Sequence, residues 1–159
     1  TINKTGYPEA QLRKPSELTA AIITAGGLIF VDNSDAADLS FTISGASINM
    51  GDIVLIGRYP ERAQATICGP ELRCKYNAAF KNLHIAASGY YNLFTTTNAT
   101  YDPTLHVEDC TVDAAYNVVY DSHNTQNFKS VYFGNSIVKM PVANKPFNST
   151  KAKDAHTQQ

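Results

Sequence analysis

The 159-residue chain has few charged residues and no excess of either sign. Asp, Glu, Lys and Arg make up 17% of it, and 13 basic against 14 acidic residues leave a net charge of −1. An average soluble chain carries about 25% charged residues. Domains that bind nucleic acid usually show a basic excess on one face, so this balance argues against a nucleic-acid partner.

Long apolar runs and cysteines are also scarce. No window reaches the roughly 18 consecutive apolar residues of a membrane-spanning helix, so the sequence predicts no membrane span. The odd count of three cysteines excludes a complete set of internal disulfides. We expect Cys68, Cys74 and Cys110 to be small core residues, with a Cys68–Cys74 bridge as the alternative in an oxidising compartment.

Motifs for metal binding and for common catalytic mechanisms are missing. The four histidines lack the spacing of metal ligands, and there is no phosphate-binding glycine loop, Cys–His dyad or serine nucleophile elbow. The acidic run Asp32, Asp35 and Asp38 lacks the Gly and Glu that complete a calcium loop, so we interpret it as a solvated turn. The sequence therefore predicts no metal site.

The residues that are abundant favour a β-protein. Ile, Val and Thr together number 35, and there are 13 Asn and nine Tyr residues. β-Branched and aromatic residues are enriched in strands. With the low charge, this composition indicates a secreted or cell-surface β-protein.

Three parts can be distinguished along the chain. Residues 1–15 contain Gly and Pro without periodicity and are interpreted as a lead-in linker. Residues 16–140 form the predicted domain, which opens with a short helix from Glu17 to about Ala25, capped by Ser16 and ended by Gly26-Gly27. Residues 141–159, which contain Pro141 and Pro146, are expected to form a cap or tail over the end of the domain.

Short strands and turns are expected in the first half of the domain. The predicted strands are separated by a loop at Ser44–Gly51 and a turn at Arg58–Arg62. The strands are Leu28–Val31, Leu39–Ile43, Asp52–Ile56 and Ala65–Cys68.

An internal repeat in the second half is the strongest signal. One pattern (apolar, any, Asn or Asp, small or apolar, any, aliphatic) occurs at 80–85, 107–112 and 133–138, at steps of 27 and 26 residues. A second match joins 91–94 to 116–119 at a step of 25. Repeats of this length with β-rich content indicate a solenoid, and the leucine-rich-repeat pattern is absent. We therefore predict an all-β, right-handed parallel β-helix of about five coils with a short N-terminal capping helix.

The repeat also predicts which side chains stack on one another. Asn82, Asp109 and Asn135 are expected at the corner between the second and third strands of each coil. Asn tolerates a left-handed backbone there, and its amide can bond to the next coil in a ladder. Outward neighbours are Lys81 with Glu108, and His106 with Tyr132. The predicted inward rows are Ala78/Leu105/Val131, Phe80/Val107/Phe133, Leu83/Cys110/Ser136 and Ile85/Val112/Val138.

These features resemble the pectate-lyase-like superfamily of right-handed parallel β-helices. The corner residues look like its asparagine ladder, and the helix before Gly26-Gly27 looks like its N-terminal capping element. Residues 52–62, 65–69 and 80–85 are similar to the opening coils of the alginate lyase and chondroitinase B type, and to uncharacterised Bacteroidetes surface β-helix domains. The resemblance implies a polysaccharide ligand. It also implies that catalytic Lys and Arg residues and calcium-binding acids lie in later coils, and no position of this chain matches those motifs.

One short run, Tyr120–His123, contains candidates for chemistry at the predicted substrate groove. Asp121 or His123 could act as a base, although a strand ending in a polar turn is the simpler explanation of the run. Glycoside hydrolysis needs two carboxylates, and the residue aligned with Asp121 is near Thr96 or Thr97. A lyase needs a Lys or Arg in the groove, and we place none on the first-sheet strands.

Tyrosines form a candidate sugar-binding strip beside that groove. Tyrosine rings stack on sugars and carry a polar end, although loop aromatics folded onto the solenoid are the alternative. The strip comprises Tyr90, Tyr91, Tyr116 and Tyr120, with Tyr132 as a further aromatic.

Three functions are consistent with these features. The first is a non-catalytic module that binds a polysaccharide at a bacterial surface, and the tyrosine strip favours it. The second is a small polysaccharide lyase or glycoside hydrolase. No cofactor is expected, with calcium as the alternative for the lyase alone. The third is a structural or assembly module of a phage tailspike or adhesin, which is expected to form a homo-oligomer.

Overall fold

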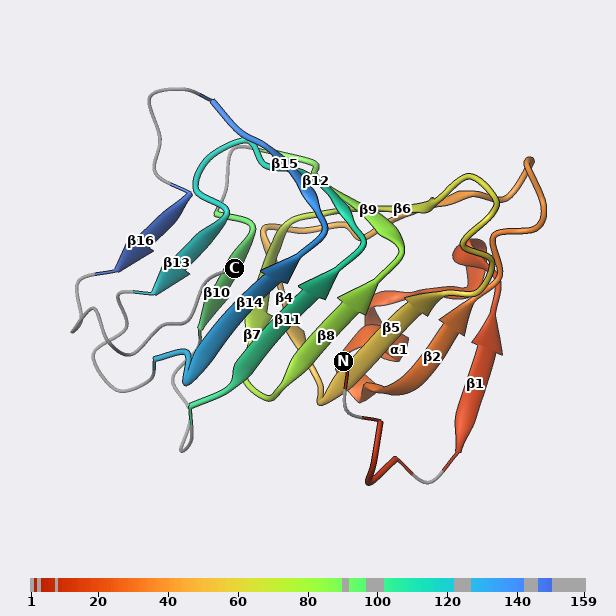
Figure 1. Cartoon of the computed structure of the whole chain (residues 1–159), viewed down its shortest axis with the longest axis horizontal. Coiled ribbons are helices and arrows are strands. Elements are labelled where there is room, and N and C mark those ends of the chain that lie inside the picture. The colour runs from red at the N-terminus through yellow and green to blue at the C-terminus, as the bar shows by residue number, and fades with distance from the viewer. Residues whose placement is uncertain are drawn as a thin grey trace.

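The computed structural model is an all-β parallel solenoid of about four turns, close to the five coils predicted. It describes residues 2, 4–7, 9–89, 92–96, 102–121, 127–141 and 146–149. Three sheets form the walls of the coil, and successive strands within each sheet come from successive turns (Figure 1). Every strand pairing is parallel, as the repeat predicted.

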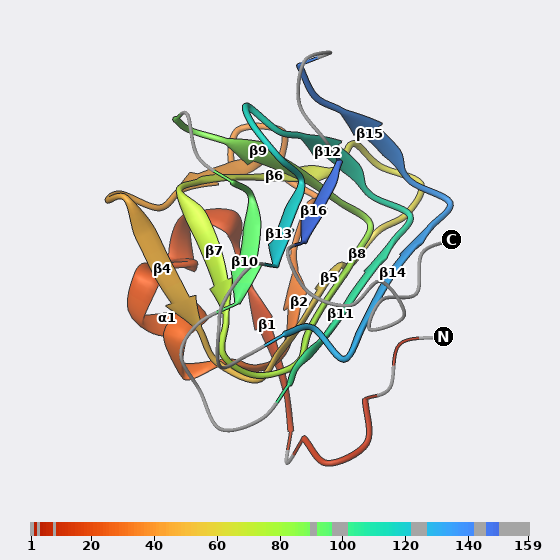
Figure 2. The same ribbon diagram turned by 90° about the vertical axis from the view of Figure 1, so that its left-hand side faces the viewer.

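The three walls are seen almost end on in Figure 2. The first sheet contains β4 (Ser47–Met50), β7 (Glu71–Cys74), β10 (Phe94–Thr96), β13 (Val119–Asp121) and β16 (Phe147–Ser149). The second contains β1 (Ala10–Arg13), β2 (Gly27–Val31), β5 (Ile53–Gly57), β8 (Ala78–Lys81), β11 (Thr104–Glu108) and β14 (Ser130–Gly134). The third contains β3 (Ser40–Thr42), β6 (Ala65–Gly69), β9 (Leu83–Ala87), β12 (Thr111–Asp113) and β15 (Ile137–Lys139).

The N-terminal helical region is shorter than predicted and begins differently. A 3-10 turn, η1 (Pro15–Glu17), precedes the helix α1 (Ala20–Ala25). Thr19 caps α1, since its side chain accepts the N–H of Ile22. The prediction of Ser16 as the cap is wrong, because its hydroxyl and N–H both bind Asp38.

Three strands were missed in the first half of the chain. β1 lies in the segment interpreted as a linker and pairs with β2, joining Ala10 to Leu28. β4 lies within the predicted loop Ser44–Gly51, and β7 lies just beyond the predicted strand at Ala65–Cys68. Each is four residues long and half polar, so its intrinsic propensity to form a strand is weak. Pairing with strands of neighbouring coils stabilises it instead.

The predicted inward rows form the core except at the end of the third sheet, where Ser136 is half-buried and Val138 is 39% exposed. The register aligns Ala78 with Leu105 and Val131, and Phe80 with Val107 and Phe133. In the third sheet, Val112 aligns with Ile85 and Val138. Rows of stacked side chains therefore close the core, as expected of strands too short to bury a face alone. The aromatic rings of Phe80, Phe94, Phe133 and Phe147 continue this stacking, with centroids 5.6–6.3 Å apart.

The corner after the second sheet has the predicted left-handed backbone. Asn82, Asp109 and Asn135 have φ angles of 54°, 53° and 48°. The side chains of Asn135 and Asp109 are joined by a hydrogen bond of 2.6 Å from Nδ2 to Oδ1. Asn82 instead donates to the carbonyl of Gly57 at 3.2 Å, and Gln64 reaches past the turn of Asn82 to the Asp109 carbonyl at 2.9 Å.

The cysteines are unbridged. Cys74 and Cys110 are buried in the core, as predicted, and Cys68 is half-buried. Burial raises the pKa of the Cys110 thiol to about 12 and that of Cys74 still further, which keeps both thiols protonated and unreactive.

Candidate functional site

A row of polar and aromatic side chains crosses the outer face of the first sheet. The register aligns Asn49 with Arg73, Arg73 with Thr95, and Thr95 with Tyr120. On β4 and β7 the flanking side chains are buried, whereas Asn49 and Arg73 are exposed. The row therefore runs along the solenoid axis across four successive strands, with Thr95 buried between the exposed Arg73 and the half-buried Tyr120.

Arg73 is held in this row by a carboxylate on its own strand. Its Nε lies 2.8 Å from Oε1 of Glu71, and the Thr95 hydroxyl donates to the same oxygen at 3.2 Å. The Arg73 side chain is 45% exposed, and its other guanidinium donors have no partner among the residues that the structure describes. The guanidinium can therefore donate hydrogen bonds to an anionic ligand.

Arg73 corrects the prediction that no Lys or Arg lies on the first-sheet strands. That prediction failed because β7 was not recognised as a strand. The alternation of exposed Arg73 with buried Leu72 and Cys74 was the available signal.

Asp121 lies on the inner side of the first sheet. The side chain is 1% exposed, and its Oδ2 accepts the N–H of buried Phe128 at 3.3 Å. Tyr120, its neighbour, is half-buried on the opposite face of β13. The carboxylate is therefore turned away from the row that contains Arg73. His123, the other candidate base, lies outside the described residues.

The tyrosine strip is described only in part. Tyr90 and Tyr91 lie outside the described residues, whereas Tyr116 is half-buried in the turn before β13. That turn is stacked on the preceding coil, since the Asn117 amide donates to Asn92 Oδ1 at 2.9 Å. The predicted 25-residue match is confirmed by the pairing of Phe94 with Val119.

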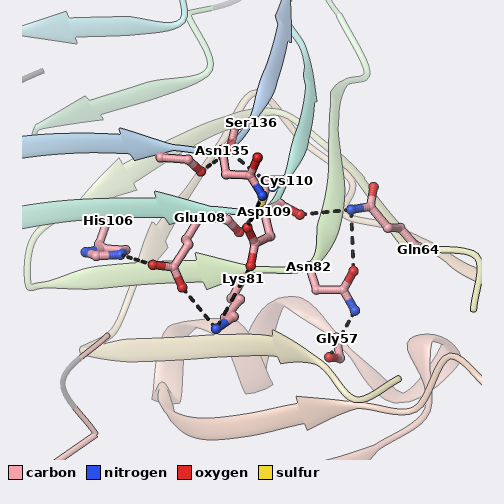
Figure 3. A network of polar contacts seen from close by, with 11 residues as sticks. Gly57, Gln64, Lys81, Asn82, His106, Glu108, Asp109, Cys110, Asn135 and Ser136 are labelled. Carbon is pink, nitrogen blue, oxygen red and sulfur yellow. Dashed lines mark hydrogen bonds and ion pairs between the residues drawn. The ribbon is translucent and has the colours of Figure 1, made fainter. Parts of the chain in front are cut away.

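Charged side chains form a network on the outer face of the second sheet (Figure 3). Lys81 Nζ lies 3.0 Å from Glu108 Oε2, and His106 Nε2 lies 3.5 Å from Glu108 Oε1. The predicted Lys81–Glu108 pair is thus confirmed. The hydrogen bond to Lys81 lowers the pKa of Glu108 and raises that of Lys81, whereas burial lowers the pKa of His106.

His106 also stacks on Tyr132, its predicted outward neighbour. The ring centroids are 4.4 Å apart at an interplanar angle of 29°. Tyr132 lies over Gly134, where an added Cβ would be 2.4 Å from the tyrosine hydroxyl. The glycine therefore gives the ring room to lie along the sheet.

A third polar arrangement, on the outer face of the third sheet, was missed by sequence reasoning. Thr66 Oγ1 lies 3.2 Å from His84 Nδ1, and His84 Nε2 lies 2.5 Å from Asp113 Oδ2. An ionised carboxylate only accepts hydrogen bonds, so Nε2 carries a proton, and in the neutral imidazole Nδ1 accepts from Thr66. This is the order of groups that activates a hydroxyl nucleophile.

Two further observations concern the part of the chain that the structure describes. It contains no group of three His, Cys, Asp or Glu side chains placed to hold a metal ion. It also contains no helix long and apolar enough to cross a membrane.

A scan against family models, a search of curated proteins and a search of solved structures each found no match for the chain.

Proposed function

We propose that this chain is a non-catalytic module that binds an acidic polysaccharide along the outer face of its first sheet. The observation that carries the proposal is the register that aligns Asn49, Arg73, Thr95 and Tyr120 in one row. The proposal places the chain among pectate-lyase-like β-helices, secreted or held at a bacterial surface.

The chemistry of the row suits an anionic sugar polymer. A guanidinium forms paired hydrogen bonds with a carboxylate or a sulfate, and Glu71 already fixes the orientation of Arg73. A tyrosine ring offers a face for stacking and a hydroxyl for hydrogen bonding. Strands of one sheet lie about 4.8 Å apart, so Arg73 and Tyr120 are separated by about 10 Å along the axis. An extended polymer lying along the solenoid can contact both.

The absence of catalysis is inferred from the placement of carboxylates. Glycoside hydrolysis uses two carboxylates about 5–9.5 Å apart across the sugar. Asp121 faces the core, and Glu71 is engaged by Arg73 and Thr95. Among the described residues, the row therefore provides groups for binding but not the pair of carboxylates that glycoside hydrolysis needs.

Affinity electrophoresis in gels containing alginate, polygalacturonate, heparin or neutral dextran tests the proposal. We expect at least one acidic polymer to retard the protein and dextran to have no effect. Hydrogen bonds to charged groups contribute about 1.5–3 kcal/mol, so Arg73→Gln should weaken binding by about tenfold or more. Tyr120→Ala should also weaken it.

Arg58→Gln is the matched control, because Arg58 is exposed in the turn between β5 and β6, away from the row. It should keep wild-type mobility. If no acidic polymer retards the protein, or if Arg58→Gln weakens binding as much as Arg73→Gln, the row is not the binding site.

The Thr66–His84–Asp113 arrangement favours a second candidate function, ester hydrolysis. His84 would take the proton of Thr66 as the hydroxyl attacks the acyl carbon of an ester, and would pass that proton to the departing alcohol. Water would then hydrolyse the acyl–Thr66 ester and release the acid. Hydrolysis of p-nitrophenyl acetate should then fall in Thr66→Val and in Asp113→Asn. Equal rates in wild type and Thr66→Val would eliminate this function.

A further inference from the structure

The second sheet begins with a strand that has one open edge. β1 is the outermost strand of that sheet, and among the described residues no strand pairs with its outer side. This edge lies at the right-hand end of the solenoid in Figure 1. The unpaired N–H and C=O groups of an edge strand form a template for pairing with another chain. The proposed function, which concerns the first sheet, does not use this edge.

The register between β1 and β2 shows which backbone groups face the open edge. Arg13 is aligned with Val31, and its carbonyl accepts the N–H of Asp32 at 2.8 Å. Along a strand, the backbone groups of successive residues point alternately to the two neighbouring strands. Because Arg13 bonds to β2, the N–H and C=O groups of Ala10 and Leu12 point to the open edge.

The side chains along this edge have different characters on the two faces of the sheet. On the outer face, Leu12 is 64% exposed and Ala10 is also exposed. On the other face, Glu9 and Arg13 lie two residues before and after Gln11, whose side-chain oxygen accepts from Arg13 Nε at 2.9 Å. The edge therefore has an apolar outer face, and charges of opposite sign at its two ends on the inner face.

An antiparallel second copy of the same strand complements all of these groups. With Gln11 opposite Gln11 of the second copy, Ala10 lies opposite Leu12, and Glu9 lies opposite Arg13. The Ala10–Leu12 pairs are then the hydrogen-bonded pairs, as the orientation of their backbone groups requires. The Glu9–Arg13 pairs are the non-hydrogen-bonded pairs, in which side chains are closer, and two-fold symmetry forms each contact twice. A shift of two residues in this register would separate Glu9 from Arg13.

We propose that this chain forms a symmetric dimer by antiparallel pairing of β1 with β1 of a second copy, centred on Gln11. The second sheets of the two copies then join into one continuous sheet. Because β1 has only four residues, the interface is small, and the dimer exchanges reversibly with monomer. The dimer does not depend on any ligand of the first sheet, so it stands or falls independently of the proposed function.

Sedimentation-velocity centrifugation over a series of protein concentrations tests this dimer. We expect the wild-type protein to sediment as a dimer at high concentration and as a monomer on dilution. Glu9→Lys and Arg13→Glu should each weaken dimerisation by about tenfold or more, because like charges directly opposite each other are destabilising and each change acts at both contacts. Lys129→Glu is the matched control, since Lys129 is exposed just before β14, at the opposite edge of the second sheet. It should dimerise like the wild type.

Mixing the two charge variants adds a gain-of-binding readout that misfolding cannot imitate. An equimolar mixture of Glu9→Lys and Arg13→Glu should form a mixed dimer, because opposite charges then meet at both contacts.

Cysteine crosslinking tests the register of the pairing. In a Cys68→Ser background, mild oxidation should link Gln11→Cys into a dimer but not Glu9→Cys, because only residue 11 lies opposite itself. The inference is overturned if the wild type is monomeric at every concentration, if its dimer survives both charge reversals, or if the mixed variants stay monomeric. Crosslinking through residue 9 instead of residue 11 would also refute the pairing.

Discussion

Replacing Asn82 with alanine should destabilise the solenoid more than the same change at Asn135. Both residues have a left-handed backbone, with φ of 54° and 48°. Asn82 is 7% exposed, and its amide donates to the Gly57 carbonyl inside the coil. Asn135 is exposed in the last described turn, where water can replace its bond to Asp109. The two variants thus share the backbone effect and differ in the buried hydrogen bond.

The magnitudes follow from these two contributions. A left-handed conformation costs a residue with a Cβ about 1–2 kcal/mol, which asparagine partly relieves and alanine does not. Loss of a hydrogen bond costs about 0.5–1.5 kcal/mol, and more when a buried partner is left unsatisfied. We expect a loss of about 2–4 kcal/mol in the free energy of unfolding for Asn82→Ala, and about 1–2 kcal/mol for Asn135→Ala. Asn82→Gly loses the same hydrogen bond as Asn82→Ala but carries no left-handed strain, so its loss should fall between wild type and Asn82→Ala.

Urea unfolding followed by far-UV circular dichroism measures these free energies, provided that the m-values agree among variants. Equal losses in Asn82→Ala and Asn82→Gly would show that left-handed strain does not determine the residue at this corner. A loss in Asn135→Ala as large as that in Asn82→Ala would show that the buried bond to Gly57 contributes nothing.

Three further predictions concern the charged network, the core and the thiols. The folded-state pKa values of His106 and Glu108 are lowered, so their contributions to stability are present at neutral pH and should be lost as pH falls below 6.5 and then below 4.5. His106→Gln should therefore flatten the fall in urea midpoint between pH 6.5 and 4.5, and an unchanged slope contradicts this. Phe80→Ala should cost about 3–5 kcal/mol because the ring is fully buried against Phe94, and a loss below about 1 kcal/mol in the same urea assay would contradict the stacked core. Ellman's reagent should label Cys68 in the native protein and Cys74 and Cys110 only after unfolding; simultaneous labelling of all three would refute their burial.

The second half of the fold could be predicted because a backbone requirement recurs once in every coil. A left-handed corner admits few residues, so Asn82, Asp109 and Asn135 mark the same place in three successive turns. Once those corners are aligned, alternation along each strand assigns every inward and outward side chain. The inward rows as far as Val112 and Phe133 and the Lys81–Glu108 and His106–Tyr132 contacts were therefore correct, whereas Val138 in the last described turn is exposed.

The first half lacks such a marker. The strands β1, β4 and β7 are four residues long and half polar, and their partners lie in other coils. Their stability comes from stacking and leaves little trace in local sequence. Missing β7 also hid Arg73, the cation of the candidate site.

The Thr66–His84–Asp113 arrangement escaped detection for a different reason. Its members are separated by 18 and 29 residues, which are not the 25 to 27 residues of the later coils. His84 faces Thr66 across one coil and reaches diagonally to Asp113 across the next, where Thr111 is its register partner. Because the coils differ in length, only the three-dimensional register of the strands reveals these contacts.

The solenoid allows the proposed binding row on the first sheet to change independently of the core. On each strand, an outward residue alternates with an inward one, so Arg73 lies beside buried Cys74 and Tyr132 beside buried Phe133. A substitution at an outward position alters one row on one wall and leaves the stacked interior column in place. In the proposed function, the first sheet can then select an anionic polymer through Arg73 while the interior stays the same. If Arg73→Gln lowered the free energy of unfolding as much as Phe80→Ala, the outer row would be coupled to the core and this independence would be refuted.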